Sequence, residues 1–211
     1  MIYDPFYQNL IDIWDHGGKD GKEGGWAAFY YGIFSRVIKE NGFKKCAEVG
    51  IGYGFHAKEI LDKTDIEKLI LVDPMAFYPN DSFADDVMRY GGFDKLVENI
   101  KTHLSPHQDR YQWFRKKSLS ITNDDIQDES LDAVFIDGDH SYDAVSRDLP
   151  FWWRKIRVGG WLLGDDYASC CPGTTKAVDE FARIYNLRIE FLTKGEGSEY
   201  ATYPIYKFVK K

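Results

Sequence analysis

The acidic and glycine residues of one short segment have the types and spacing needed to hold a small ligand. Glu48 is followed by Gly50, Gly52 and Gly54 in the pattern E-x-G-x-G-x-G, between an apolar run and a segment of helical spacing. Glycine has no Cβ, so it permits positive φ and lets backbone N–H groups approach a ligand closely. A loop of this kind before a helix suits a nucleotide-like or carboxylate-bearing ligand. A tight strand-to-helix turn that binds nothing is the simpler alternative.

A second acidic residue, Asp73, ends the apolar segment LILVD, 25 residues after Glu48. A carboxylate at the end of that strand is well placed to accept two hydrogen bonds from a ribose diol. A dinucleotide-binding fold prefers the spacing G-x-G-x-x-G, which this loop does not have. The two motifs together therefore favour a nucleoside-containing cofactor, and the glycine spacing argues against an NAD-dependent oxidoreductase.

Further acidic residues follow two later apolar strands, in FIDGDHSYDAV at 135–145 and GDDYASCCPG at 164–173. The carboxyl ends of parallel strands share one edge of a sheet, so we expect Asp137, Asp165 and Asp166 to line one crevice with Glu48 and Asp73. Five carboxylates in one cleft repel each other unless a cation offsets them. Oxygen ligands alone suit Mg²⁺ or Mn²⁺, with Ca²⁺ as a further option, better than zinc.

These acidic loops also have structural interpretations. Asp165 and Asp166 would serve equally as a helix N-cap and a solvated turn residue. His140 is a candidate general base with a pKa near neutrality. It would serve as well by capping the following helix or by holding Asp137 in place.

Composition excludes several classes of protein. The net charge is −7, and a surface that tracks nucleic-acid phosphates needs clustered Lys and Arg, so no nucleic-acid partner is expected. No apolar run reaches the length of a membrane span, and the N-terminus lacks a signal-peptide layout. The three cysteines are odd in number and show no paired framework, which favours a reducing, cytoplasmic compartment.

Apolar periodicity predicts strands alternating with helices. Strands are expected at 44–49, 67–73, 111–116, 131–137 and 161–166, and helices at 3–14, 26–41, 54–63, 93–104, 141–155 and 172–185. Two further strands, 187–193 and 200–209, alternate like an antiparallel hairpin. Residues 15–25 form a glycine-rich charged loop. This order predicts an α/β fold with a doubly wound, seven-stranded, mostly parallel sheet and an antiparallel C-terminal strand.

The glycine motif, the strand-end acids and the order of elements resemble class I S-adenosylmethionine-dependent methyltransferases. The segments DGDHSY, GGWLLGDDY and PGTTKAVDEF most resemble the cation-dependent sugar O-methyltransferases around macrocin O-methyltransferase. The resemblance implies that residues 44–211 bind S-adenosylmethionine, and that residues 1–43 form a helical lid over the acceptor. It places the cofactor-binding residues at Glu48, Gly50, Gly52, Gly54, Asp73, Ser118 and Asp137, the cation ligands at Asp137, Asp165 and Asp166, and the catalytic residues at Asp137, His140 and Asp165.

The expected reaction is metal-assisted transfer of a methyl group to a hydroxyl of a sugar, in a glycan or glycoside. Some sugar methyltransferases of this type carry a histidine just after the tandem aspartates. Ala168 stands there in this sequence, so the base is sought at Asp165 or His140 instead. A catechol is the alternative acceptor, and an NAD-dependent oxidoreductase or a non-catalytic module on the same fold are the rival functions. A homodimer, or one domain of a larger polypeptide, is also compatible with the sequence.

Overall fold

A seven-stranded sheet forms the centre of the molecule. We describe a computed structural model over residues 3–16, 32–77, 82–192 and 204–211. The strands are β1 Lys45–Val49, β2 Lys68–Val72, β3 Tyr111–Phe114, β4 Leu131–Ile136, β5 Ile156–Gly164, β6 Glu190–Phe191 and β7 Tyr206–Val209. Their order across the sheet is β3-β2-β1-β4-β5-β7-β6, and β7 runs antiparallel to both of its neighbours. The predicted doubly wound sheet with an antiparallel C-terminal strand is confirmed.

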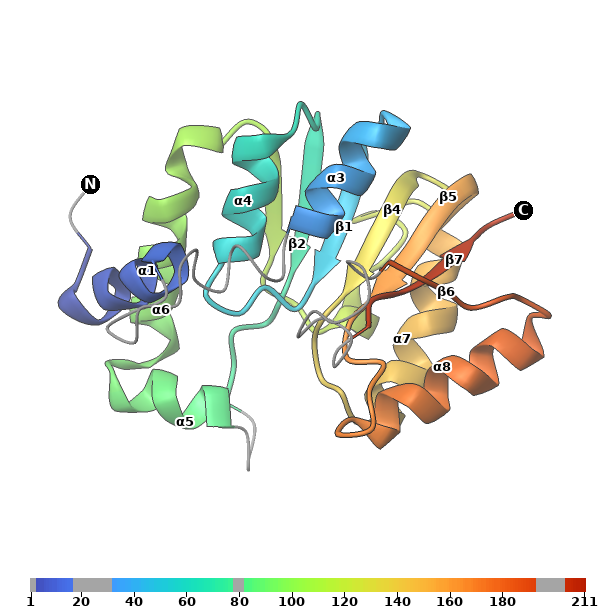
Figure 1. Ribbon diagram of the computed structural model, residues 1–211. Coiled ribbons are helices and arrows are strands. Elements are labelled where there is room, and N and C mark those ends of the chain that lie inside the picture. Colours follow the sequence, from blue (N-terminus) through green and yellow to red (C-terminus); the bar gives the residue numbers. More distant parts are fainter. Residues whose placement is uncertain (1–2, 17–31, 78–81, 193–203) are drawn as a thin grey trace.

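Helices cover both faces of this sheet (Figure 1). They are α1 Pro5–His16, α3 Gly32–Asn41, α4 Phe55–Lys63, α5 Ser82–Arg89, α6 Gly92–Leu104, α7 Tyr142–Lys155 and α8 Pro172–Ile184. The apolar faces of α3, α4 and α6 form one core cluster with Cys46, Leu71 and Phe135. The faces of α7 and α8 form a second cluster with Val49 and Val134, on the opposite side of the strands. Because both faces are covered, the central strands are apolar at nearly every position.

The described N-terminal helices belong to the core. Tyr7 of α1 is fully buried, and its hydroxyl donates to the carbonyl of Tyr53 at 2.7 Å. Phe34 of α3 is 1% exposed and stacks on Phe135 of β4 with ring centroids 5.4 Å apart. Both helices therefore stabilise the domain that carries the glycine loop. The predicted role of residues 1–43 as a lid stays a prediction, and residues 17–31 lie outside the described residues.

Two elements differ from the expected ones. Helix α5 was not expected, because no helix was predicted from the apolar spacing of its eight residues. Strand β5 begins at Ile156 instead of 161, and its pairing with β4 shifts register between Leu131 and Ala133. Gly160 lies within this irregular part, where a Cβ would meet the carbonyl oxygen of Asp132 at 2.6 Å. The expected turn between the last two strands lies outside the described residues.

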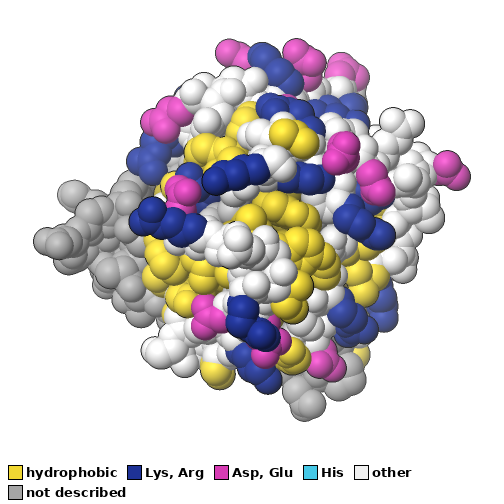
Figure 2. All heavy atoms as spheres, turned by 90° about the vertical axis from the view of Figure 1, so that its right-hand side faces the viewer, with side chains coloured by type: hydrophobic (Ala, Val, Ile, Leu, Met, Phe, Trp, Pro, Cys, Tyr) yellow, Lys and Arg dark blue, Asp and Glu magenta, His cyan; other side chains and the backbone are white. Residues whose placement is uncertain are grey.

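The edge of the sheet at β6 has no further strand beyond it in the described part of the chain. Figure 2 views the molecule from this end and shows hydrophobic side chains gathered between Lys and Arg side chains. Exposed hydrophobic residues of the elements near this edge include Val158, Ile184, Tyr185 and Phe191. Among the described residues, no helix has the length and apolar character needed to cross a membrane.

Candidate active site

The glycine loop between β1 and α4 adopts a backbone that glycine alone adopts easily. Gly50, Gly52 and Gly54 have φ values of 83°, 48° and 80°. A Cβ on Gly50 would lie 2.1 Å from the carbonyl oxygen of Asp137, so the loops after β1 and β4 touch through this glycine. A Cβ on Gly52 would meet no atom of the described residues within 4 Å. The loop is therefore packed against protein at Gly50, and among the described residues it leaves space beside Gly52 for the close approach of a ligand.

Asp73, at the end of β2, holds this loop in place. Its Oδ2 accepts a hydrogen bond from the backbone N–H of Ile51 at 3.0 Å, and its Oδ1 accepts one from Met75 at 2.8 Å. Burial raises the pKa of Asp73, and the backbone donors oppose that rise. A carboxylate has about four acceptor positions, so each oxygen keeps capacity for a further donor such as a ribose hydroxyl.

Glu48 lies beneath the loop, where it is 1% exposed. Its Oε1 is 2.9 Å from Nδ1 of His56, which belongs to the first turns of α4 and is itself buried. Burial raises the pKa of Glu48, with His56 opposing the rise and Asp137 and Asp73 adding to it. Within the described residues Oε2 of Glu48 has no hydrogen-bond partner. His56 was not singled out in the sequence, although its place eight residues after Glu48 was visible.

Asp137, His140 and Asp166 form one cluster. His140 Nδ1 lies 2.9 Å from Oδ2 of Asp166, and its Nε2 lies 3.4 Å from Oδ1 of Asp137, which is long for a hydrogen bond. The two carboxylates raise the pKa of His140 to about 10. In this arrangement His140 is charged at neutral pH, its Nδ1 pairs with Asp166, and its Nε2 has no hydrogen-bond partner among the described residues. It can accept a proton only after losing one, so the expected pKa near neutrality does not hold here.

The surroundings of Asp165 differ from those of this cluster. It is 3% exposed, and within the described residues its Oδ1 has no hydrogen-bond partner. Burial raises the pKa of Asp165 well above its ordinary value, and Asp166 adds to the rise. Asp166 itself has a φ of 56°, an uncommon value for a residue other than glycine. This turn directs the two adjacent aspartates into different surroundings.

The arrangement does not match the predicted cation site. The oxygen donors suit Mg²⁺ or Mn²⁺. However, His140 lies between Asp137 and Asp166, and no group of three His, Cys, Asp or Glu residues in the described chain is placed to hold a metal ion. The assignment of Asp137, Asp165 and Asp166 as metal ligands stays a prediction, and we derive no chemical step through a metal.

Ser118, expected near an adenine ring, belongs to a chain of hydrogen bonds that was not visible in the sequence. Trp152 Nε1 donates to Ser118 Oγ at 2.8 Å, and Ser118 Oγ donates to Asp148 Oδ1 at 2.6 Å. Trp152 is fully buried, and Asp148 is 7% exposed. Burial raises the pKa of Asp148 to about 6, although Ser118 opposes the rise. The chain fixes the turn after β3 to helix α7.

Comparison with known families decides the identity of this fold. A family model described as a methyltransferase domain matches residues 47–167, from β1 to the residue after the tandem aspartates. This chain belongs to the methyltransferase domain family. The matched region contains the glycine loop, Asp73, Ser118, the DGDH segment and Asp165–Asp166.

Individual relatives of this methyltransferase domain are distant. Protein R132 of Acanthamoeba polyphaga mimivirus, an uncharacterized protein, is 24% identical over 123 residues, which is 57% of this chain and 50% of that protein. The matched part therefore spans only half of the relative's length. Among solved structures, the methyltransferase domain of bacterial CtHen1 has a TM-score of 0.59 at 13% identity, over 85% of this chain and 96% of that chain.

A second structure with the same fold contains a ligand. The N-methyltransferase NodS of Bradyrhizobium japonicum WM9, in complex with S-adenosyl-L-homocysteine, has a TM-score of 0.57 at 11% identity, over 97% of this chain and 98% of that chain. Likeness at this level of identity shows the fold alone.

Proposed function

We propose that this methyltransferase domain transfers the methyl group of S-adenosylmethionine to a hydroxyl of a sugar. The observation that carries the proposal is the glycine loop, which touches protein at Gly50, leaves space beside Gly52 among the described residues and is held by Asp73. The family match and the S-adenosyl-L-homocysteine bound to NodS support the choice of cofactor. When bound, S-adenosylmethionine supplies a sulfonium methyl group for in-line displacement by an oxygen nucleophile.

The residues of this chain bind and orient the two reactants. With the cofactor bound, Asp73 would accept hydrogen bonds from the ribose hydroxyls, and Ser118 would contact the adenine. Asp137 and Asp166, with side chains 19% and 16% exposed, present carboxylate oxygens to the acceptor. A hydroxyl that donates to one of these oxygens is held with its lone pair free for attack. The proton that leaves the hydroxyl is taken up by a carboxylate, of Asp137, Asp166 or Asp165, or by His140 once it has lost its own proton.

The acceptor class follows from residues 172–181. This segment resembles sugar O-methyltransferases, which favours a glycan or glycoside over a catechol. A divalent cation, as in those enzymes, stays a separate part of the proposal. The geometry supports it only if Asp137 and Asp166 release His140, because the imidazole lies between their oxygens.

A pair of glycine variants tests cofactor binding directly. Gly52→Ala would place a methyl group in the space assigned to the cofactor, and Gly42→Ala is its matched control. Gly42 precedes β1 and has a φ of 62°, and a Cβ there also meets no atom of the described part of the chain within 4 Å. Each variant is expected to lose about 1–2 kcal/mol of unfolding free energy, because each places alanine in a left-handed conformation.

Only Gly52→Ala is expected to lose affinity for S-adenosyl-L-homocysteine. Overpacking of about 1–3 kcal/mol corresponds to a rise in Kd of roughly 5- to 150-fold, measured by calorimetry. Gly42→Ala should bind as the wild type does. Equal affinities in the two variants would contradict the placement of the cofactor at this loop.

A further inference from the structure

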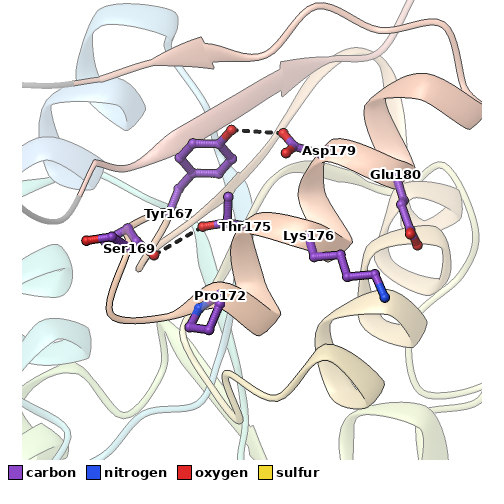
Figure 3. A pocket seen from close by; sticks show the side chains of 8 residues that line it. Tyr167, Ser169, Pro172, Thr175, Lys176, Asp179 and Glu180 are labelled. Atoms are coloured by element: carbon purple, nitrogen blue, oxygen red, sulfur yellow. Dashed lines mark hydrogen bonds between the residues drawn. The ribbon is translucent and has the colours of Figure 1, made fainter.

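A cavity of about 530 Å³ opens beside the loop that carries Asp166. Figure 3 shows its lining side chains, which come from the loop after β5 and from helix α8. The lining residues are Tyr167, Ala168, Ser169, Pro172, Thr175, Lys176, Asp179 and Glu180. A volume of this size lies within the range of about 300–1,000 Å³ that is usual for small-molecule sites.

The cavity lies close to the candidate active site. Tyr167 directly follows Asp166, and the first turn of α8 packs against the segment that contains His140. Thr174 Oγ1 donates to the carbonyl of His140 at 3.3 Å. A Cβ on Gly173 would lie 2.9 Å from that same carbonyl oxygen, so the helix and the loop after β4 are in close contact. A ligand in the cavity would therefore lie next to the acidic cluster.

Two tyrosine–carboxylate pairs give the cavity its chemistry. Tyr167 donates its hydroxyl to Asp179 Oδ1 at 2.8 Å, which fixes one carboxylate at the wall of the cavity (Figure 3). Tyr142, two residues after His140, donates to Glu180 Oε2 at 2.6 Å. Each bond engages one oxygen and leaves the other carboxylate oxygen with acceptor capacity. A fifth group, Lys176, places its ammonium 4.2 Å from the centre of the Tyr142 ring.

This combination favours a neutral ligand with several hydroxyl groups. Asp179, Glu180 and the neighbouring Asp166 outnumber Lys176, so an anionic ligand would be repelled. Fixed carboxylates accept hydrogen bonds from hydroxyl donors, and an aromatic ring such as Tyr167 provides an apolar surface for the C–H groups of a pyranose.

We propose that this cavity is the acceptor subsite, and that it binds a neutral pyranose ring through Asp179, Glu180 and Tyr167. The proposal rests on the proposed function, since it names where the sugar acceptor of that reaction binds.

The test uses ligand-observed saturation-transfer NMR on the full chain. The probes are the methyl glycosides of glucose, galactose, mannose and rhamnose, with catechol and S-adenosyl-L-homocysteine in separate samples. The variants are Asp179→Asn and Glu180→Gln, and the control is Asp143→Asn, an exposed carboxylate of α7 outside the cavity. Thermal unfolding of each variant confirms that it folds.

We expect at least one glycoside to bind the wild type and the Asp143→Asn control equally. Its affinity should fall by about 10-fold in Asp179→Asn and in Glu180→Gln. Affinity for S-adenosyl-L-homocysteine should stay within about twofold of the wild type in all variants. Binding of no glycoside, or glycoside binding that both variants leave unchanged, would overturn the subsite. Catechol binding that the variants abolish, without glycoside binding, would overturn the sugar assignment. If the wild type does not bind S-adenosyl-L-homocysteine, the proposed function is contradicted. The glycoside measurements would still show whether the cavity binds a sugar.

Discussion

Asp148 provides a quantitative test of the hydrogen-bond chain behind the Ser118 turn. This carboxyl group is 7% exposed, and burial raises its pKa from 3.8 to about 6. A folded-state pKa above the unfolded value means that the folded protein binds the proton more tightly. Asp148 therefore lowers the unfolding free energy as pH rises from about 4 to about 6, and the full destabilisation is present above that range.

The magnitude follows from the two pKa values. A difference of roughly two pH units corresponds to about 3 kcal/mol of unfolding free energy. The substitution Asp148→Asn removes the charge and keeps an acceptor oxygen for the Ser118 hydroxyl, which now bonds at 2.6 Å. The weaker hydrogen bond to a neutral acceptor is expected to offset about 1 kcal/mol of the gain.

Urea unfolding at several pH values measures this effect. The unfolding free energy of Asp148→Asn, minus that of the wild type, should increase by about 3 kcal/mol between about pH 4 and about pH 8. Other titrating groups cancel in this difference, and Asp143→Asn controls for removal of a carboxylate from the same helix. A difference that stays constant over the whole pH range would refute the reasoning, because Asp148 would then titrate alike in the folded and unfolded chains.

Two further predictions concern the acidic cluster. If His140 takes part in proton transfer, His140→Ala should lower kcat by roughly 10²–10⁴-fold with little change in cofactor affinity. Nearly unchanged turnover in this variant would assign the base to Asp165 or to the exposed Asp139 instead. Methyl transfer to glycosides should fall in EDTA and return with Mg²⁺ or Mn²⁺ if a cation acts in the reaction, and full activity in chelator would show that the aspartates work without one.

Much of the fold was predictable because its signals are local. The apolar run LDAVFI gave strand β4 within one residue, and the glycine spacing gave a loop whose three glycines all have positive φ. The order of strands and helices then determined the sheet, since parallel crossovers are right-handed and place the strand ends at one edge. The irregular start of β5 was missed, because its register depends on how Gly160 packs against Asp132.

The sequence predicted which residues form the candidate site better than it predicted the contacts between them. Asp137 and Asp166 were expected to be neighbours, and both lie beside His140. The sequence left His140 open between a general base and a residue that caps the helix or holds Asp137 in place. The partners Glu48–His56 and Ser118–Asp148 join residues of different elements. Such pairs depend on the rotation of a helix against the sheet, and a single sequence carries no direct signal of that rotation.

Calorimetric titration of the wild-type chain with S-adenosyl-L-homocysteine, and separately with NAD⁺, tests the central claim most directly. The glycine loop and the carboxylate of Asp73 predict binding of S-adenosyl-L-homocysteine with a Kd on the order of micromolar. The spacing of the glycines, which is not the G-x-G-x-x-G of dinucleotide-binding folds, predicts no binding of NAD⁺. Binding of NAD⁺ without S-adenosyl-L-homocysteine, or of neither ligand, would contradict the assignment of this loop to the methyl donor.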